Sequence, residues 1–113
     1  MIDSYRFGQI VVRGKRYSGD IKIVMGEVVS GWRRKEGHVL QASDIDDILS
    51  TTPEILVVGM GEPGNMRVSD DLRRHLPGSG LVLVEEPTSR AVKTFNEFFR
   101  SGRKVAGAFH LTC

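Results

Sequence analysis

Glycine recurs in the segment VVGMGEPG, residues 57–64, with a spacing that could hold a phosphate group. Gly59, Gly61 and Gly64 follow an apolar run, as in a dinucleotide-binding turn whose backbone amides face a pyrophosphate. In such a turn the next helix begins inside the glycine motif, so that its amino-terminal amides reach the ligand. Here residues 63–68 lie between the glycine turn and the next helix start signal, which is Ser69. We therefore do not expect a bound dinucleotide, and the sequence predicts no cofactor.

A smaller ligand fits the same region better. In open parallel sheets, ligands collect beyond the carboxyl ends of the strands. A glycine turn there can present several amides to a carboxylate or phosphate, and a threonine at a helix start offers a further donor. The structural alternative is that the glycines permit close packing and the threonine only caps a helix. The candidate ligand-binding residues at this edge are Gly59, Met60, Gly61, Glu62, Gly64, Glu86, Thr88 and His110.

Groups suited to catalysis or metal binding are few. Adjacent strand residues point to opposite faces, so Glu85 and Glu86 cannot act as a facing pair. His110 could carry a proton, but a hydrogen-bonded histidine at the edge of the core is the simpler interpretation. The single cysteine is Cys113, and the histidines are far apart in sequence. We predict neither a catalytic residue nor a metal site.

Strands in the second half of the chain must position the candidate residues. Three apolar runs lack the period-two alternation of half-buried strands, which favours parallel strands covered on both faces. Two helical patterns separate these runs, so residues 54–111 predict a βαβαβ unit with a mainly parallel sheet. The runs cover residues 55–58, 81–84 and 104–109.

The two helices of this unit have start and stop signals. The first is expected to start at Ser69 and to be stopped by Pro77-Gly78. The second is expected to start at Thr88 or Ser89, with Gly102 just past its end.

The first half of the chain has a different pattern. Residues 1–42 contain short β-prone runs and turn glycines, which predict antiparallel hairpins. Ser43 followed by an acid three residues later predicts a capped short helix over residues 43–52. Val28 and its neighbours up to Trp32 could expose an unpaired strand edge through which the chain self-associates as a homo-oligomer. The fold class is therefore α/β, with the βαβαβ unit packed against antiparallel strands and one short helix in a single domain, residues 1–113.

Composition excludes several classes of protein. The chain has 113 residues, 40% hydrophobic and 27% charged, which is typical of a globular domain. Its net charge of +2 is too balanced for a nucleic-acid-binding surface. The basic clusters Arg13-Gly14-Lys15-Arg16 and Arg33-Arg34-Lys35 are interpreted as solvated turns, and nucleic-acid binding through them ranks third among the functions. We find no export signal and no apolar run that could span a membrane, so we expect a cytoplasmic protein.

Four segments resemble a known protein family. PEILVVGMGEPG, GLVLVEEPTSRAVKTFNEFF and GRKVAGAFHLTC are similar to a small family of uncharacterised single-domain proteins, and GWRRKEGHVLQASDIDDIL resembles its middle region. That family includes a mitochondrial respiratory complex I assembly factor and a mammalian adipogenesis-associated protein. The most specific likeness lies in the Gly-x-Gly turn and in Glu85, Thr88, Ala91, Asn96 and Gly102-Arg103.

The resemblance implies a compact α/β domain without a known ligand or activity. Its eukaryotic members act with partner proteins. We therefore rank first a non-enzymatic protein-interaction or assembly module with an unknown protein partner. The alternative is a small-molecule or anion-binding protein, or an enzyme, that uses the glycine turn at residues 59–64 and the strand ends.

Overall fold

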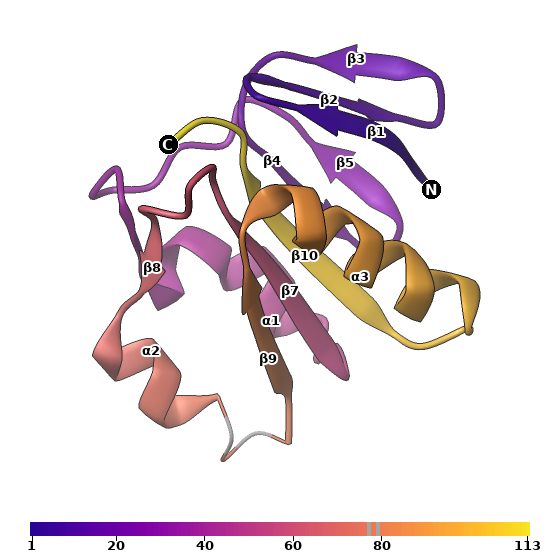
Figure 1. Ribbon diagram of the computed structural model, residues 1–113. Helices are drawn as coiled ribbons and strands as arrows, with labels where there is room; N and C mark the ends of the chain where they lie inside the picture. The colour runs from indigo at the N-terminus through magenta and orange to yellow at the C-terminus, as the bar shows by residue number, and fades with distance from the viewer. Residues whose placement is uncertain (77, 79) are drawn as a thin grey trace.

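The computed structural model of the chain describes residues 1–76, 78 and 80–113. Its centre is a five-stranded sheet in the order β5-β4-β10-β7-β9 (Figure 1). β7 pairs in parallel with both β10 and β9, whereas β4 runs antiparallel to β10 and to β5. The α/β class and the parallel carboxyl-terminal strands predicted from the sequence are confirmed. The strands are β4 (Ile21–Val24), β5 (Glu27–Val29), β7 (Ile55–Met60), β9 (Val82–Glu86) and β10 (Val105–His110).

A separate antiparallel sheet is formed by β1 (Ile2–Arg6), β2 (Gln9–Val12) and β3 (Lys15–Tyr17). The prediction of antiparallel hairpins is confirmed, but the sequence pattern did not reveal β1 or β3. β3 is polar, and the basic cluster that includes its first residues, Arg13-Gly14-Lys15-Arg16, has the pattern of a solvated turn. The turn itself is only Arg13 and Gly14, whose φ angles of 48° and 79° suit a two-residue hairpin connection.

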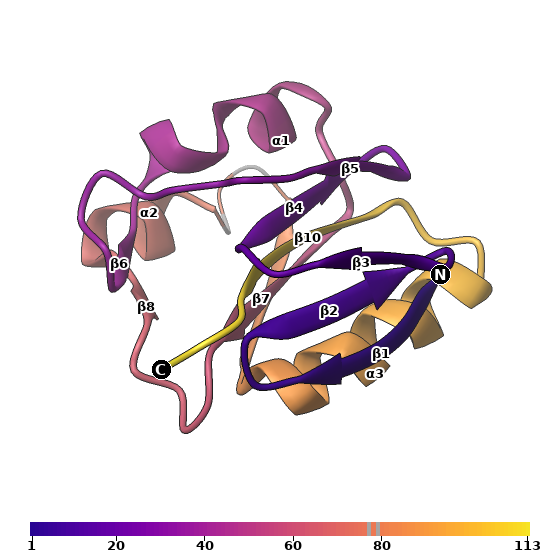
Figure 2. The same cartoon turned by 90° about the horizontal axis from the view of Figure 1, so that it is seen from above.

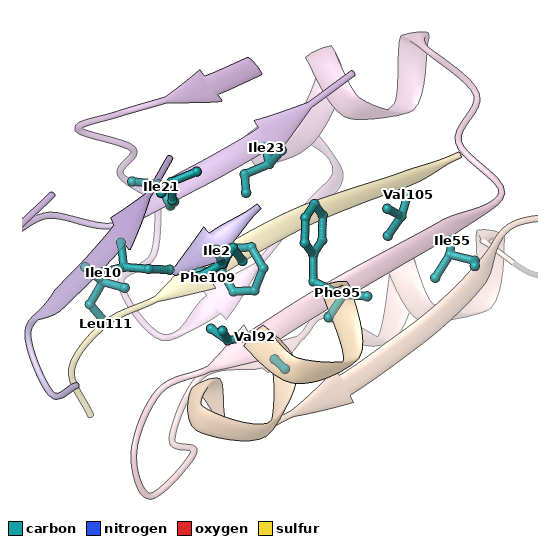
Figure 3. Close-up of a cluster of buried hydrophobic side chains, with 13 residues drawn as sticks. Ile2, Ile10, Ile21, Ile23, Ile55, Val92, Phe95, Val105, Phe109 and Leu111 are labelled. Atoms are coloured by element: carbon teal, nitrogen blue, oxygen red, sulfur yellow. The ribbon is translucent and has the colours of Figure 1, made fainter. Parts of the chain in front are cut away.

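Helix α3 (Thr88–Arg100) and the three-stranded sheet cover one face of the central sheet. Ala91, Val92 and Phe95 recur at helical spacing and are buried there. Figure 3 shows Val92 and Phe95 in this cluster. The ring of Phe95 stands edge-on to that of Phe109, with centroids 5.7 Å apart. Gly107 makes room for the Phe109 ring, because a Cβ at position 107 would lie 2.4 Å from that ring. The amphipathic helix predicted after β9 is confirmed, and Gly102 lies just beyond its end.

The opposite face is covered by the 3-10 helix η1 (Ala42–Ile45), α1 (Asp46–Ser50), α2 (Asp70–His75) and the short strands β6 (Val39–Leu40) and β8 (Arg67–Val68). Figure 2 shows the central sheet between these helices and the layer that contains α3. The parallel pair β6 and β8 was not predicted, because two-residue strands leave no periodic signal.

Helix starts on this face agree with the sequence only in part. Ser69 caps α2, since its hydroxyl accepts a 3.1 Å hydrogen bond from the amide of Leu72. The expected cap at Ser43 is wrong: η1 begins one residue earlier, and the Asp44 carboxylate accepts a bond from the amide of Gln41. The predicted stop at Pro77 lies outside the described residues.

Two further expectations concern exposure. β5 is an edge strand, and Val29 is partly exposed, but Trp32 is buried and donates through its indole nitrogen to the Asp44 carbonyl oxygen. Trp32 is therefore a core residue and not part of an exposed edge. In the described part of the chain, the structure has no helix with the length and apolar character needed to span a membrane.

Candidate functional site

The predicted site residues meet where β7, β9 and β10 end and α3 begins. Met60 is paired with His110 across the β7–β10 ladder, and Gly59 is paired with Glu86 across the β7–β9 ladder. Thr88 follows β9 directly at the start of α3. We call this edge, residues 59–64 with Glu86, Thr88 and His110, the strand-end rim. Parallel pairing brings these residues together, as the strand pattern predicts.

Thr88 is the central residue of the strand-end rim and is fully buried. Its hydroxyl donates a 2.6 Å hydrogen bond to the carbonyl oxygen of His110 and accepts a 2.8 Å bond from the amide of Gly61. The expected helix cap at Thr88 or Ser89 is wrong, because Pro87 occupies the N-cap position and Thr88 is already the first residue of α3. A hydroxyl has only one proton, so the Thr88 hydroxyl has no donor left for a ligand.

Gly61 packs against the carboxyl-terminal segment. Its φ is +89°, and a Cβ there would lie 2.2 Å from the Thr112 carbonyl oxygen and 2.8 Å from the His110 ring. The next amide, that of Glu62, donates to the same Thr112 oxygen at 3.0 Å. Two amides of the glycine turn are thus bonded within the chain. This geometry supports the packing interpretation of the turn.

The Glu62 carboxylate lies at the amino terminus of α3. Its Oε1 accepts bonds from the Ser89 hydroxyl at 2.6 Å and from the Ser89 amide at 2.9 Å. The hydroxyl bond and then the amide bond hold the pKa of Glu62 below its usual range. An acid of the chain itself therefore occupies the helix terminus where the sequence predicts an external anion.

The two glutamates at the end of β9 point to opposite faces, as predicted. Glu85 forms a two-nitrogen ion pair with Arg73 of α2. Glu86 accepts a 2.6 Å bond from the Thr94 hydroxyl of α3 and lines a polar hollow of about 430 Å³ along that helix. Gly64 has a φ of +114° and lies against Pro87.

His110 belongs to a buried cluster that sequence reasoning missed. Its Nδ1 lies 2.8 Å from Oδ2 of Asp20 and 3.1 Å from Nη2 of Arg34. Arg34 and Asp20 form an ion pair at 2.8 Å, with side chains that are 6% and 15% exposed. The interpretation of His110 as a hydrogen-bonded histidine at the core boundary is confirmed. The interpretation of Arg34 as a solvated turn residue is wrong.

Hydrogen bonds set the ionisation of Asp20. Burial alone would raise the pKa of this carboxyl. Bonds from His110, from the Leu111 amide at 2.8 Å and from Arg34 outweigh burial and hold the pKa below its usual range. Asp20 is therefore an anion at neutral pH. No local sequence signal indicates this role, because its partners lie many residues away.

A larger hollow lies on the other side of the molecule. We call it the α1/α2 groove; its volume is about 450 Å³. Most of its wall is apolar, and an aspartate and a histidine of α2 stand at its edge. None of the predicted site residues lines it. Its lining residues in the described part of the chain are Ala42, Leu49, Thr52, Pro53, Asp71, Leu72, His75, Leu76 and Leu81.

Several solved structures share this arrangement of sheet and helices. A conserved hypothetical protein from Pyrococcus horikoshii is similar over 100% of this chain and 99% of its own, with a TM-score of 0.87 and 24% sequence identity. The protein MT938 is 30% identical, with a TM-score of 0.81 and coverage of 100% and 98%. A Bordetella pertussis protein described as a Mth938-like domain has a TM-score of 0.75 and 23% identity, over 98% of this chain and 85% of its own.

The fold is thus that of a mixed α/β domain similar to Mth938-like domains. The family model described as a protein of unknown function, DUF498/DUF598, matches residues 2–110. The chain belongs to this family. The resemblance noted from the sequence is confirmed at the level of the family.

Proposed function

We propose that the chain is a non-enzymatic protein-interaction or assembly module whose partner inserts an apolar side chain into the α1/α2 groove. The observation that supports this proposal is the apolar wall of the groove, to which Leu49, Leu72 and Leu81 contribute. Protein interfaces draw most of their binding free energy from a few large side chains that fill such pockets. A groove of about 450 Å³ has room for a leucine or phenylalanine side chain with part of its own backbone.

Backbone strain at the groove supports the proposal. Thr52, which lines the groove, has a φ of +48°. A β-branched residue is rarely found in this left-handed region, where the strain costs on the order of 1–3 kcal/mol. Such strain persists where the surrounding structure fixes it, and it is concentrated at binding and catalytic sites.

The lining of the groove indicates the chemistry of the partner. Two helices flank the groove, an arrangement that suits an amphipathic helix laid along it with apolar anchors one turn apart. The Asp71 carboxylate at the edge is 75% exposed, and its contacts with Arg74 at 3.7 Å and His75 at 3.6 Å both use Oδ1. Its Oδ2 is left for a basic residue on the polar face of that helix. We therefore propose a partner helix with one leucine or phenylalanine anchor and a neighbouring lysine or arginine.

An assembly role is what the family resemblance implies, because that family includes a respiratory complex I assembly factor, and we propose this role here for a cytoplasmic protein. Pairing of two copies through the edge strand β5 is a further proposal. Sedimentation at several concentrations tests it. A mass that stays at one chain at every concentration would contradict self-association.

The alternative function, a protein that binds a small molecule or anion through the glycine turn, has weaker support. The Gly61 amide and the Thr88 hydroxyl are bonded to each other, and Glu62 occupies the start of α3. The polar hollow that Glu86 lines together with Arg90 and Lys93 is the feature that favours it. Thermal stabilisation by inorganic phosphate that Arg90→Ala removes would support this alternative.

Affinity capture with matched variants tests the proposed function. Leu49→Glu places a charge in the α1/α2 groove, whereas Met25→Glu places one on an exposed turn outside it. We expect the wild type and Met25→Glu to retain one stoichiometric partner that Leu49→Glu loses. Circular dichroism must show that both variants are folded. Retention of the partner by folded Leu49→Glu would overturn the proposal.

A further inference from the structure

A third cavity lies beside the buried Asp20–Arg34–His110 cluster, at the end of β10. Its volume is about 340 Å³, and Asp20, Trp32, Arg33 and Arg34 line it together with three glycines. It shares no lining residue with the α1/α2 groove in the described part of the chain. The cavity is therefore separate from the surface proposed for the protein partner.

The Arg34 guanidinium is the buried polar group of this cavity. The central carbon of Arg34 lies 4.8 Å from the centroid of the Trp32 ring. The Nε of Arg34 donates a 2.6 Å hydrogen bond to the Gly37 carbonyl oxygen. Nη1 of Arg34 is buried, and its one contact among the described residues is the ion pair with an Asp20 oxygen at 2.8 Å, which can engage only one of its two N–H groups. The stacking and the Nε bond hold the guanidinium in a fixed orientation with a donor to spare.

The cluster contains more buried donors than acceptors. Arginine has five N–H groups, and one of the two Asp20 oxygens already accepts the Leu111 amide. Nδ1 of His110 cannot accept from Arg34 and donate to Asp20 at the same time. If Nδ1 carries the proton, Nη2 of Arg34 loses its acceptor.

The other tautomer leaves a different donor unpaired. If Nε2 of His110 carries the proton, that nitrogen is buried without a partner among the described residues. A buried donor without an acceptor costs roughly 1–3 kcal/mol. The 2.8 Å contact with the Asp20 carboxylate favours the proton on Nδ1, because a bare Nδ1 would set its lone pair against that oxygen. In this tautomer an acceptor-only group in the adjacent cavity, which Arg34 lines, would satisfy the guanidinium donor that His110 cannot accept.

Charge selects the kind of acceptor. Arg33 and Arg34 contribute two positive charges to the cavity wall and Asp20 contributes one negative charge, so a single negative charge balances them. A carboxylate carries one negative charge and matches the planar guanidinium, whereas a phosphate group at neutral pH carries about 1.5 to 2. We propose that this cavity binds the carboxylate group of an organic acid or of a peptide terminus.

Trp32 provides a direct readout, because it is the only tryptophan of the chain and lies against Arg34. Acetate and benzoate are titrated while tryptophan fluorescence and the amide resonances of Gly31 and Gly37 are recorded. Benzamide is the uncharged control for benzoate. We expect saturable changes with both acids and none with benzamide, and equal responses to benzoate and benzamide would overturn the proposal.

Further ligands identify the source of the carboxylate. A tetrapeptide with a free carboxyl terminus is compared with its amidated form, so that binding of the free-acid peptide alone would assign the site to polypeptide ends. Inorganic phosphate tests the charge argument. Saturable binding of phosphate tighter than that of either acid would contradict the choice of a carboxylate.

Variants locate the binding. Arg33→Gln changes an exposed side chain and should weaken benzoate binding by up to roughly five-fold, the contribution of one exposed ion pair. Arg34→Lys keeps the charge opposite Asp20 but removes the guanidinium, and it should abolish binding. Arg16→Gln, on β3, is the matched control and should bind like the wild type. Wild-type affinity in both Arg33→Gln and folded Arg34→Lys would overturn the proposal.

Discussion

The hydroxyl of Thr88 donates a 2.6 Å hydrogen bond to the carbonyl oxygen of His110, which connects the first residue of α3 to the last residue of β10. The same hydroxyl accepts from the amide of Gly61, just after β7. A single buried side chain therefore joins three segments at the strand-end rim. The glycine turn is held in place by this contact, and the amides of Gly61 and Glu62 are bonded within the chain.

Thr88→Val should destabilise the protein by roughly 2–4 kcal/mol, because it leaves a buried amide and a buried carbonyl without a partner. Thr88→Ser keeps the hydroxyl and should cost about 1 kcal/mol for the lost methyl group. Urea denaturation of both variants measures the difference. Equal stability of the two variants would contradict the role assigned to the hydroxyl.

Gly61→Ala should be more destabilising than an alanine at another left-handed glycine. At Gly61 the new Cβ would overlap the Thr112 carbonyl oxygen, whereas at Gly102, with a φ of +77°, nothing lies within 4 Å. The strain of the left-handed backbone costs about 1–2 kcal/mol at either position, so any excess at Gly61 reports the overlap. Similar melting temperatures for the two variants would show that the Thr112 segment moves aside freely.

Acidification should remove the stability contributed by Asp20. The folded-state pKa of this carboxyl is lowered, so its contribution is complete above the unfolded-state pKa of about 3.9 and is lost as the pH falls through the folded-state pKa. The difference in unfolding free energy between the wild type and Asp20→Asn should be largest above about pH 5 and should shrink below about pH 4. A difference that is constant from pH 7 to pH 3 would contradict this assignment.

Thr52→Gly should stabilise the protein by about 1 kcal/mol, because glycine adopts the positive φ without the steric cost of a β-branched side chain. Ser50→Gly is the matched control inside α1, and it should destabilise by roughly 0.5–1 kcal/mol. Thermal unfolding of both variants provides the comparison. Thr52 lines the α1/α2 groove, so Thr52→Gly removes a side chain from the groove wall and should also weaken binding of the partner.

The parallel strands were predictable because β7, β9 and β10 are uninterrupted apolar runs, and the start of α2 was predictable because Ser69 and the amide that it caps are three residues apart. The role of Thr88 was not predictable, because a threonine at the start of a helix can either cap that helix or bond to distant strands, and the sequence pattern is the same for both. The Asp20–His110 contact joins residues 90 positions apart, which no local pattern encodes. Long-range polar contacts of this kind depend on the completed fold.

Site-specific photo-crosslinking in cells tests the central proposal most directly. A photoreactive phenylalanine analogue replaces His75, an exposed residue of the α1/α2 groove, and in a second variant it replaces Lys15, an exposed residue of β3. We predict one discrete heavier product from position 75, containing a second protein, and no such product from position 15. No product from position 75, or the same product from both positions, would contradict the assignment of the groove as the partner-binding surface.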